Sequence, residues 1–136
     1  MSNKLDNTER RKRQRFLAQR NGKPYFWVMI DGQRMPLIDL SLEGFSIAAT
    51  APPESDKTFT FELRLEDVPG KVRGQAQTVN FISGEPAGQI GCRFISLESD
   101  SAITLHEWLT VHVICAATVR ISAKEAESIV SGPSLI

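Results

Sequence analysis

The chain has 136 residues, 41% of them hydrophobic, which suits one domain with a single core. Its formal net charge is zero, but residues 1–34 carry nine Lys/Arg against three Asp/Glu, and residues 35–136 carry seven against thirteen. This asymmetry predicts a basic arm on a mildly acidic body, which argues against a protein that coats nucleic acid. The polar first residues do not resemble a signal peptide, because no apolar segment follows their charges. No stretch of the sequence approaches the roughly 18 apolar residues of a membrane span. We therefore expect a cytoplasmic protein without membrane insertion.

Six segments with strand character follow the arm. The first ends at Asp31-Gly32, a dipeptide typical of tight hairpins, and Pro36 predicts an edge position or a bulge in the returning strand. The predicted strands cover residues 24–30, 33–38, 44–50, 57–65, 71–82 and 89–95. Because short turns join all of them, they predict a mainly β fold, a six-stranded antiparallel β-barrel.

The pattern becomes helical after the last strand. Residues 101–117 carry apolar anchors at helical spacing and predict a C-terminal α-helix, although the β-branched residues from Leu109 onward leave a strand open as an alternative. Ser122 and Glu125 match a capping box, which predicts a short helix over residues 123–130. The expected organisation is a flexible basic arm over residues 1–20, a barrel with its helix over 21–118, and an extension with a loose tail over 119–136.

Two tryptophans and two cysteines are expected in the interior. Trp27 and Trp108 are predicted to anchor the core. Cys92 and Cys115 lie in apolar stretches without CxxC spacing, which favours buried, reduced thiols. Segment 108–117 is unusually apolar for one barrel to cover, which leaves a homodimer open as an alternative.

No catalytic constellation is evident in the sequence. His106 and His112 are six residues apart, which separates them by about 120° around a helix, whereas the zinc-protease pattern needs i, i+4 spacing. Both are therefore interpreted as residues of the helix faces. Glu66 and Asp67 are adjacent in a predicted turn, where a solvated charged tip is expected. We expect no enzyme, no cofactor and no metal site.

Two short polar motifs are not required by a plain barrel. RRKRQR at 10–15 contains an R-x-x-x-R pair, and DLSLEG at 39–44 contains D-x-S-x-x-G, which alone could be a simple Asx-type turn. With a hairpin between the motifs, and GCRF at 91–94 in the last strand, the chain resembles the PilZ family of bacterial cyclic di-GMP receptors over about residues 9 to 115. The matching residues are Arg11, Arg15, Asp39, Ser41 and Gly44.

The resemblance implies a PilZ-like split barrel that binds cyclic di-GMP, and base chemistry agrees with it. An arginine fork such as that of Arg11 or Arg15 matches the O6 and N7 acceptors of guanine, and a guanidinium can also stack on a base or bridge a phosphate. The Asp39 carboxylate would accept from the N1–H and N2–H₂ edge, and Ser41 would add a donor or acceptor. Gly44 would permit a close backbone approach or a positive φ.

Two further arginines are weaker candidates for ligand contact. Arg10 directly precedes the first motif, and Arg93 lies in the last strand, where an ion pair with a body carboxylate is an equal alternative. The arm is expected to close over the ligand and to present an altered surface to an unidentified downstream effector protein. The resemblance implies roles in motility, exopolysaccharide production or virulence.

Two other functions stay open at this point. The basic arm could serve a nucleic-acid-binding barrel, although the body is acidic and offers no obvious series of exposed aromatic residues. The chain could also be a protein-interaction module that binds no nucleotide. Whether one or two cyclic di-GMP molecules would bind is not determined by the sequence.

Overall fold

A computed structural model describes residues 14–51, 57–117 and 121–132 of the chain. The first strands in these ranges are β1 (Phe16–Leu17), β2 (Gln19–Arg20), β3 (Lys23–Pro24), β4 (Phe26–Ile30) and β5 (Gln33–Leu40). They are followed by β6 (Gly44–Ala49), β7 (Thr58–Leu65), β8 (Val68–Ile82) and β9 (Gly88–Leu97). The helices are α2 (Ser101–Ala116) and α3 (Ala123–Ser131).

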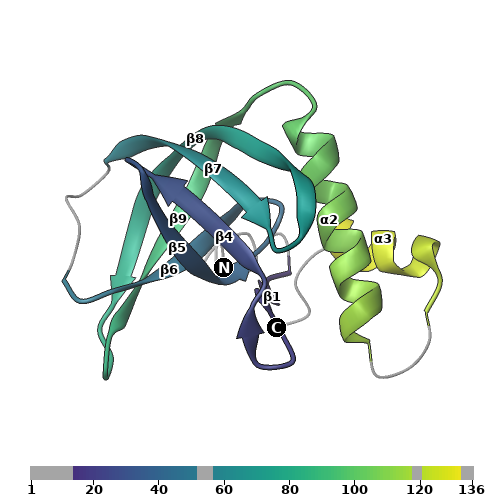
Figure 1. Cartoon of the computed structure of the whole chain (residues 1–136), viewed down its shortest axis with the longest axis horizontal. Coiled ribbons are helices and arrows are strands. Elements are labelled where there is room, and N and C mark those ends of the chain that lie inside the picture. The colour runs from purple at the N-terminus through teal and green to yellow at the C-terminus, as the bar shows by residue number, and fades with distance from the viewer. Residues whose placement is uncertain (1–13, 52–56, 118–120, 133–136) are drawn as a thin grey trace, which may run out of the picture.

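The six longer strands close into a barrel. The sheet order is β1-β5-β4-β7-β8-β9-β6, and an additional pairing of β5 with β6 joins the two ends, with all neighbours antiparallel. The barrel consists of β4 to β9, while β1 is an extra short strand beside β5 (Figure 1). The predicted six-stranded antiparallel barrel is therefore confirmed.

The first hairpin has the turn that its sequence predicts. Asp31 and Gly32 both have positive φ, 51° and 79°, as a two-residue type I′ turn requires. Pro36 pairs with Trp27 of β4, whereas the pairing of β5 with β6 begins one residue later, at Leu37. A register shift follows between Leu37 and Asp39. The proline thus lies next to a bulge, at the end of the β6 pairing.

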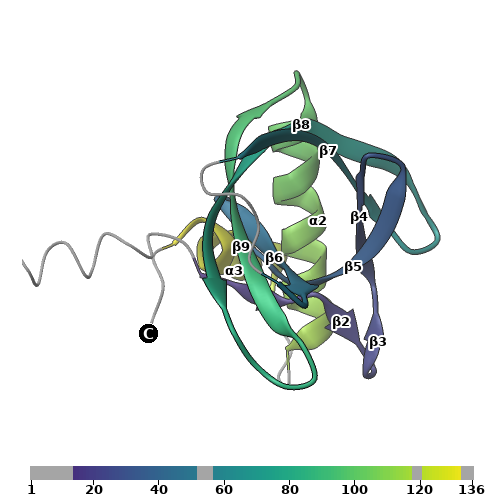
Figure 2. The same cartoon turned by 90° about the vertical axis from the view of Figure 1, so that its left-hand side faces the viewer.

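The core fills the barrel and continues to α2, which lies across one end of it (Figures 1 and 2). Leu105, Trp108 and Leu109 are buried on the helix face toward the barrel. This 3–4 spacing of buried residues explains why the stretch after Leu109 continues as helix rather than strand. α3 begins at the predicted capping box, in which Ser122 Oγ accepts from Glu125 N at 3.1 Å and Ser122 N donates to Glu125 Oε1 at 2.9 Å.

The prediction that Trp27 anchors the core is wrong. Its neighbours Phe26 and Val28 are both fully buried, and alternation along β4 therefore turns Trp27 to the outer face. There its indole N–H donates to Glu66 Oε1 at 2.8 Å, and the guanidinium of Arg34 lies 3.7 Å from the ring centroid. Glu66 is thus a hydrogen-bond acceptor for Trp27 instead of a merely solvated turn residue.

The two cysteines also differ from each other. Cys92 is buried in the core, as predicted, and burial raises the pKa of its thiol to about 12. Cys115 is exposed, so the prediction of a second buried thiol is wrong. It lies in the last turn of α2, beside the face that His112 and Val113 bury. Val111 and Ile114 are exposed on the same helix, and the homodimer stays a prediction.

The end of the predicted arm is part of the folded body. Ala18 is fully buried between β1 and β2, its N–H donates to the Ile38 carbonyl at 3.0 Å, and its own carbonyl accepts from Tyr25 N at 3.0 Å. Residues 16–20, assigned to the arm by their sequence, therefore pack on the barrel because their backbone is paired. Arg10 and Arg11 lie outside the described residues. The expected flexibility of the arm that carries them therefore stays a prediction.

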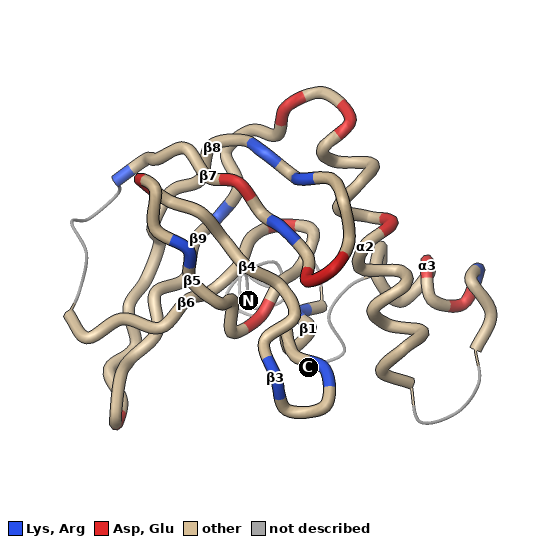
Figure 3. The backbone as a smooth tube through the Cα atoms, in the orientation of Figure 1, with Lys and Arg blue, Asp and Glu red and all other residues tan. Residues whose placement is uncertain are grey.

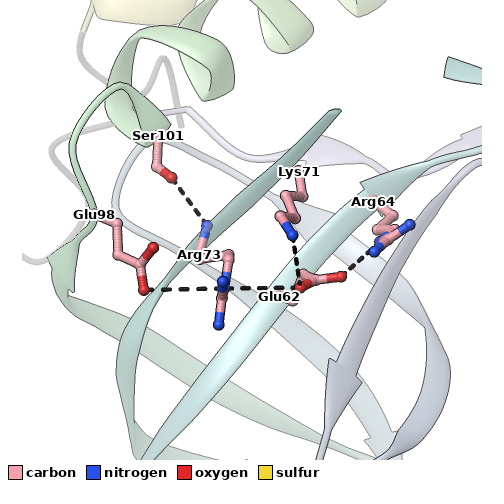
Figure 4. A network of polar contacts seen from close by, with 6 residues as sticks. All are labelled: Glu62, Arg64, Lys71, Arg73, Glu98 and Ser101. Carbon is pink, nitrogen blue, oxygen red and sulfur yellow. Dashed lines mark hydrogen bonds and ion pairs between the residues drawn. The ribbon is translucent and has the colours of Figure 1, made fainter. Parts of the chain in front are cut away.

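Acidic and basic residues are interspersed along β7 and β8 (Figure 3). The centre of this network is Glu62, whose carboxylate lies 2.6 Å from Arg64 Nε, 3.7 Å from Arg73 Nε and 4.0 Å from Lys71 Nζ (Figure 4). Because the carboxylates neutralise the neighbouring cations, this surface is poorly suited to bind the phosphate backbone of a nucleic acid.

Candidate functional site

The two polar motifs meet on the barrel surface. β1 pairs with β5 so that Leu17 is opposite Asp39. Arg15 lies two residues before Leu17, and this register brings it close to Asp39. Arg15 Nη1 lies 3.8 Å from Asp39 Oδ1, although the residues are 24 positions apart in the sequence. Their side chains are 43% and 19% exposed, so the pair borders solvent. The structure thus joins the second arginine of R-x-x-x-R to the first residue of D-x-S-x-x-G.

Ser41 holds the turn between β5 and β6. Its side chain is buried, its Oγ accepts from Glu43 N at 3.0 Å, and its N–H donates to the Gly44 carbonyl at 2.9 Å. A hydroxyl that accepts one bond still has its own proton to donate. Ser41 therefore shapes the motif in the free protein and keeps one donor for a ligand.

Gly44 has a steric role in the barrel. A Cβ at this position would overlap the Cys92 carbonyl oxygen of β9, the strand that pairs with β6 here. Of the two roles that the sequence left open, the glycine serves a close backbone approach, and that approach is between β6 and β9. Any larger residue would push these strands apart beside Asp39 and Ser41.

Arg93 lies beside the motif but has no carboxylate partner among the described residues. It is directly opposite Gly44 in the β6–β9 register, and its Nη2 donates to Gln77 Oε1 at 2.8 Å. The alternative of an ion pair with a body carboxylate is therefore not what the structure shows. Within the described ranges, the guanidinium charge therefore has an amide partner rather than a carboxylate, and it lies near the motif.

One residue beside Asp39 was not singled out in the sequence. Ser46 of β6 is directly opposite Asp39, is 2% exposed, and its Oγ has no hydrogen-bond partner within the described parts of the chain. Asp39 Oδ1 is likewise buried and without a hydrogen bond there. Alternation from Gly44 could have indicated that residue 46 faces outward, but only the register of β5 against β6 places it beside Asp39.

A buried histidine ties α2 to the segment that carries Arg15. His112 is 2% exposed and its Nε2 lies 2.7 Å from the Leu17 carbonyl, so this nitrogen carries the proton and donates it. Nδ1 accepts from Arg20 Nε at 3.2 Å. Burial lowers the pKa of His112, the carbonyl contact raises it and the charge of Arg20 lowers it further, for a net decrease. The imidazole is therefore a neutral structural group.

The described residues show neither a metal site nor a membrane-spanning helix. In residues 14–51, 57–117 and 121–132, no group of three or more His, Cys, Asp or Glu side chains has the arrangement of a metal site. Within the same ranges, no helix combines the length and the apolar character needed to cross a membrane.

Comparison with known protein families decides the classification. The family model described as PilZ domain matches residues 9–110, which include both motifs and the whole barrel. The chain belongs to the PilZ domain family. The matched region covers the barrel and the first part of α2.

Solved structures with the same fold support the assignment of the architecture. The Bacillus subtilis inhibitor of motility, MotI/DgrA, is 11% identical with a TM-score of 0.63, over 79% of this chain and 53% of that protein. MrkH, described as a c-di-GMP-dependent transcription regulatory factor, is 18% identical with a TM-score of 0.56, over 76% of this chain and 50% of that protein. At these identities the likeness shows the PilZ fold alone, and the chain spans about half the length of these two proteins. A search of curated proteins found no match.

Proposed function

We propose that this PilZ domain is a cyclic di-GMP receptor without catalytic activity. The observation that carries the proposal is the 3.8 Å approach of Arg15 Nη1 to Asp39 Oδ1, because it assembles one site from two motifs that are far apart in the sequence. A guanidinium and a carboxylate side by side supply the two complementary halves that guanine needs, donors for O6 and N7 and an acceptor for N1–H and N2–H₂. The family and the c-di-GMP dependence stated for MrkH support the same ligand.

In this proposal each residue of the site has a separate role. Arg15 and Arg11 bind guanine and phosphate, Asp39 accepts from the purine edge, and Ser41 donates its remaining proton. Gly44 allows β6 to lie close to β9, which preserves the backbone conformation of the D-x-S-x-x-G turn. Arg93, opposite Gly44, adds positive charge at the rim, and Arg10 is a further candidate for phosphate contact.

The weakness of the Arg15–Asp39 pair in the free protein supports a ligand-binding role. At 3.8 Å and with Arg15 43% exposed, the pair lies beyond hydrogen-bond distance and its contribution to stability is small. Both groups are therefore available to a ligand at little cost. We further propose that the basic arm then closes over the dinucleotide and that the new surface contacts an effector protein.

Titration calorimetry tests the receptor. The wild-type chain should bind cyclic di-GMP with micromolar or tighter affinity and should bind neither GTP nor single-stranded DNA. Arg11→Ala, Arg15→Ala and Asp39→Ala should each weaken binding by at least about tenfold, the loss expected when a charge-assisted hydrogen bond to a base is removed.

The control is Arg64→Ala, which removes an exposed arginine of the β7 network. It should leave the affinity for cyclic di-GMP unchanged. Binding of DNA that grows with DNA length and survives Asp39→Ala would instead favour the nucleic-acid-binding barrel. A chain that binds none of these ligands would favour the protein-interaction module.

A further inference from the structure

Ser46 and Asp39 both carry a buried oxygen atom that has no hydrogen bond within the described residues. Most buried hydroxyls and carboxylates in folded proteins have a hydrogen-bond partner, so an orphan is uncommon. Within the described residues, three side chains carry such atoms, Arg20, Asp39 and Ser46, and the last two are directly opposite each other on β5 and β6. Asp39 Oδ1 has only the open ion pair with Arg15, at 3.8 Å, and Ser46 Oγ has no partner within the described residues. Two missing hydrogen bonds at one cross-strand pair indicate a place where a ligand could supply them.

The register explains why the two atoms face the same side. Leu40 and Phe45 form the neighbouring cross-strand pair and are both in the core, 0% and 2% exposed. Because side chains alternate along a strand, the pair Asp39–Ser46 faces the opposite, outer side of the barrel wall. Directly opposite residues have Cβ atoms about 5 Å apart, so one ligand edge can reach both side chains.

The chemistry of the pair is complementary rather than redundant. An ionised Asp39 only accepts hydrogen bonds, whereas the hydroxyl of Ser46 both donates and accepts. The Ser46 side chain is almost fully buried, but Asp39 is 19% exposed and opens the pair to solvent. A ligand that binds Asp39 therefore lies against Ser46 as well.

We propose that Ser46 is a ligand-contacting residue, outside both sequence motifs, that hydrogen-bonds cyclic di-GMP together with Asp39. This inference rests on the proposed function. It makes an unusual prediction for the free protein, because a buried hydroxyl without a partner destabilises the fold. Removing it should cost affinity for the ligand but no stability.

The experiment measures affinity and thermal stability of Ser46→Ala in the full chain. We expect the dissociation constant for cyclic di-GMP to rise roughly 2- to 12-fold, the effect of one hydrogen bond, while the Tm stays equal or rises. Ser46→Cys replaces the hydroxyl by a slightly larger thiol that donates only weakly, and should lose affinity in the same direction.

The matched control is Ser101→Ala. Ser101 is also a buried serine, but its Oγ accepts from Arg73 N at 3.0 Å (Figure 4). Its loss should lower the Tm and leave the affinity unchanged, the reverse of the pattern expected for Ser46.

Each outcome separates the two proposals. If the wild type binds cyclic di-GMP and Ser46→Ala binds equally well, the role of Ser46 is refuted while the receptor stands. A clear fall in the Tm of Ser46→Ala would show that the hydroxyl has a partner in the free protein, and this also refutes the inference. If the wild type itself does not bind, the proposed function fails first and the role of Ser46 with it.

Discussion

Arg15 and Asp39 lie 3.8 Å apart in an open ion pair that joins the strand entering the barrel to the D-x-S-x-x-G turn. The pair is at the edge of β1 and β5, where Leu17 is opposite Asp39. Because the pair is long and partly exposed, a change at Arg15 should alter the proposed binding of cyclic di-GMP with little effect on the free energy of unfolding.

Arg15→Lys should behave like Arg15→Ala in ligand binding, although it keeps the charge. Lysine lacks the planar fork that matches two acceptors of guanine, so most of the affinity should be lost. The free energy of unfolding should change by less than about 1 kcal/mol in both variants, because the ion pair is long, at 3.8 Å, and Arg15 is 43% exposed. Calorimetry with cyclic di-GMP and urea denaturation check this, and full affinity of Arg15→Lys would show that only charge matters.

Gly44→Ala should destabilise the protein by about 2 kcal/mol, because the new methyl group overlaps the Cys92 carbonyl and must displace β6 or β9. Urea denaturation measures this. The control is Gly22→Ala, where the methyl group meets nothing within 4 Å and the φ of +76° alone costs about 1 kcal/mol. Equal losses in the two variants would contradict a steric role for Gly44.

His112 should make stability depend on pH. Its pKa is lowered in the folded chain by burial, so the unfolded chain binds the proton more readily. Stability from the neutral imidazole is complete above its unfolded pKa of about 6.5 and is lost as the pH falls from there through the lowered folded pKa. The slope contributed by this one group is at most about 1.4 kcal/mol per pH unit.

Urea denaturation between pH 8 and pH 5 measures the effect. His112→Gln should have a smaller dependence on pH in this range than the wild-type chain. A wild-type slope that His112→Gln leaves unchanged would refute this assignment.

The two thiols should react at very different rates. Cys115 is exposed and should be labelled by a thiol reagent in the native protein. Cys92 is buried with its pKa raised to about 12, and should react only after unfolding in denaturant. Mass spectrometry before and after denaturation counts the labelled thiols. The Cys115→Ser variant should have no labelled thiol before it is unfolded. Labelling of both cysteines in the native chain would contradict the buried position of Cys92.

Much of the architecture could be predicted from local patterns. Asp31-Gly32 specifies a turn whose backbone only a few residue types tolerate, and the capping box of Ser122 and Glu125 satisfies its own helix end within four residues. Such features depend on interactions between near neighbours in the chain, so the sequence alone determines them. The two polar motifs can be recognised in the sequence because they are short and contiguous, but only strand pairing brings Arg15 to Asp39.

The tertiary structure decided which residues meet and which face each one occupies. Trp27 lies on the outside and Cys115 is exposed, because burial depends on the side of a strand or helix that the rest of the fold covers. Arg15 reaches Asp39, and Ser46 faces it, only because β1, β5 and β6 pair in one register. Register is a property of paired strands, and a shift by one residue would turn every one of these side chains to the other face.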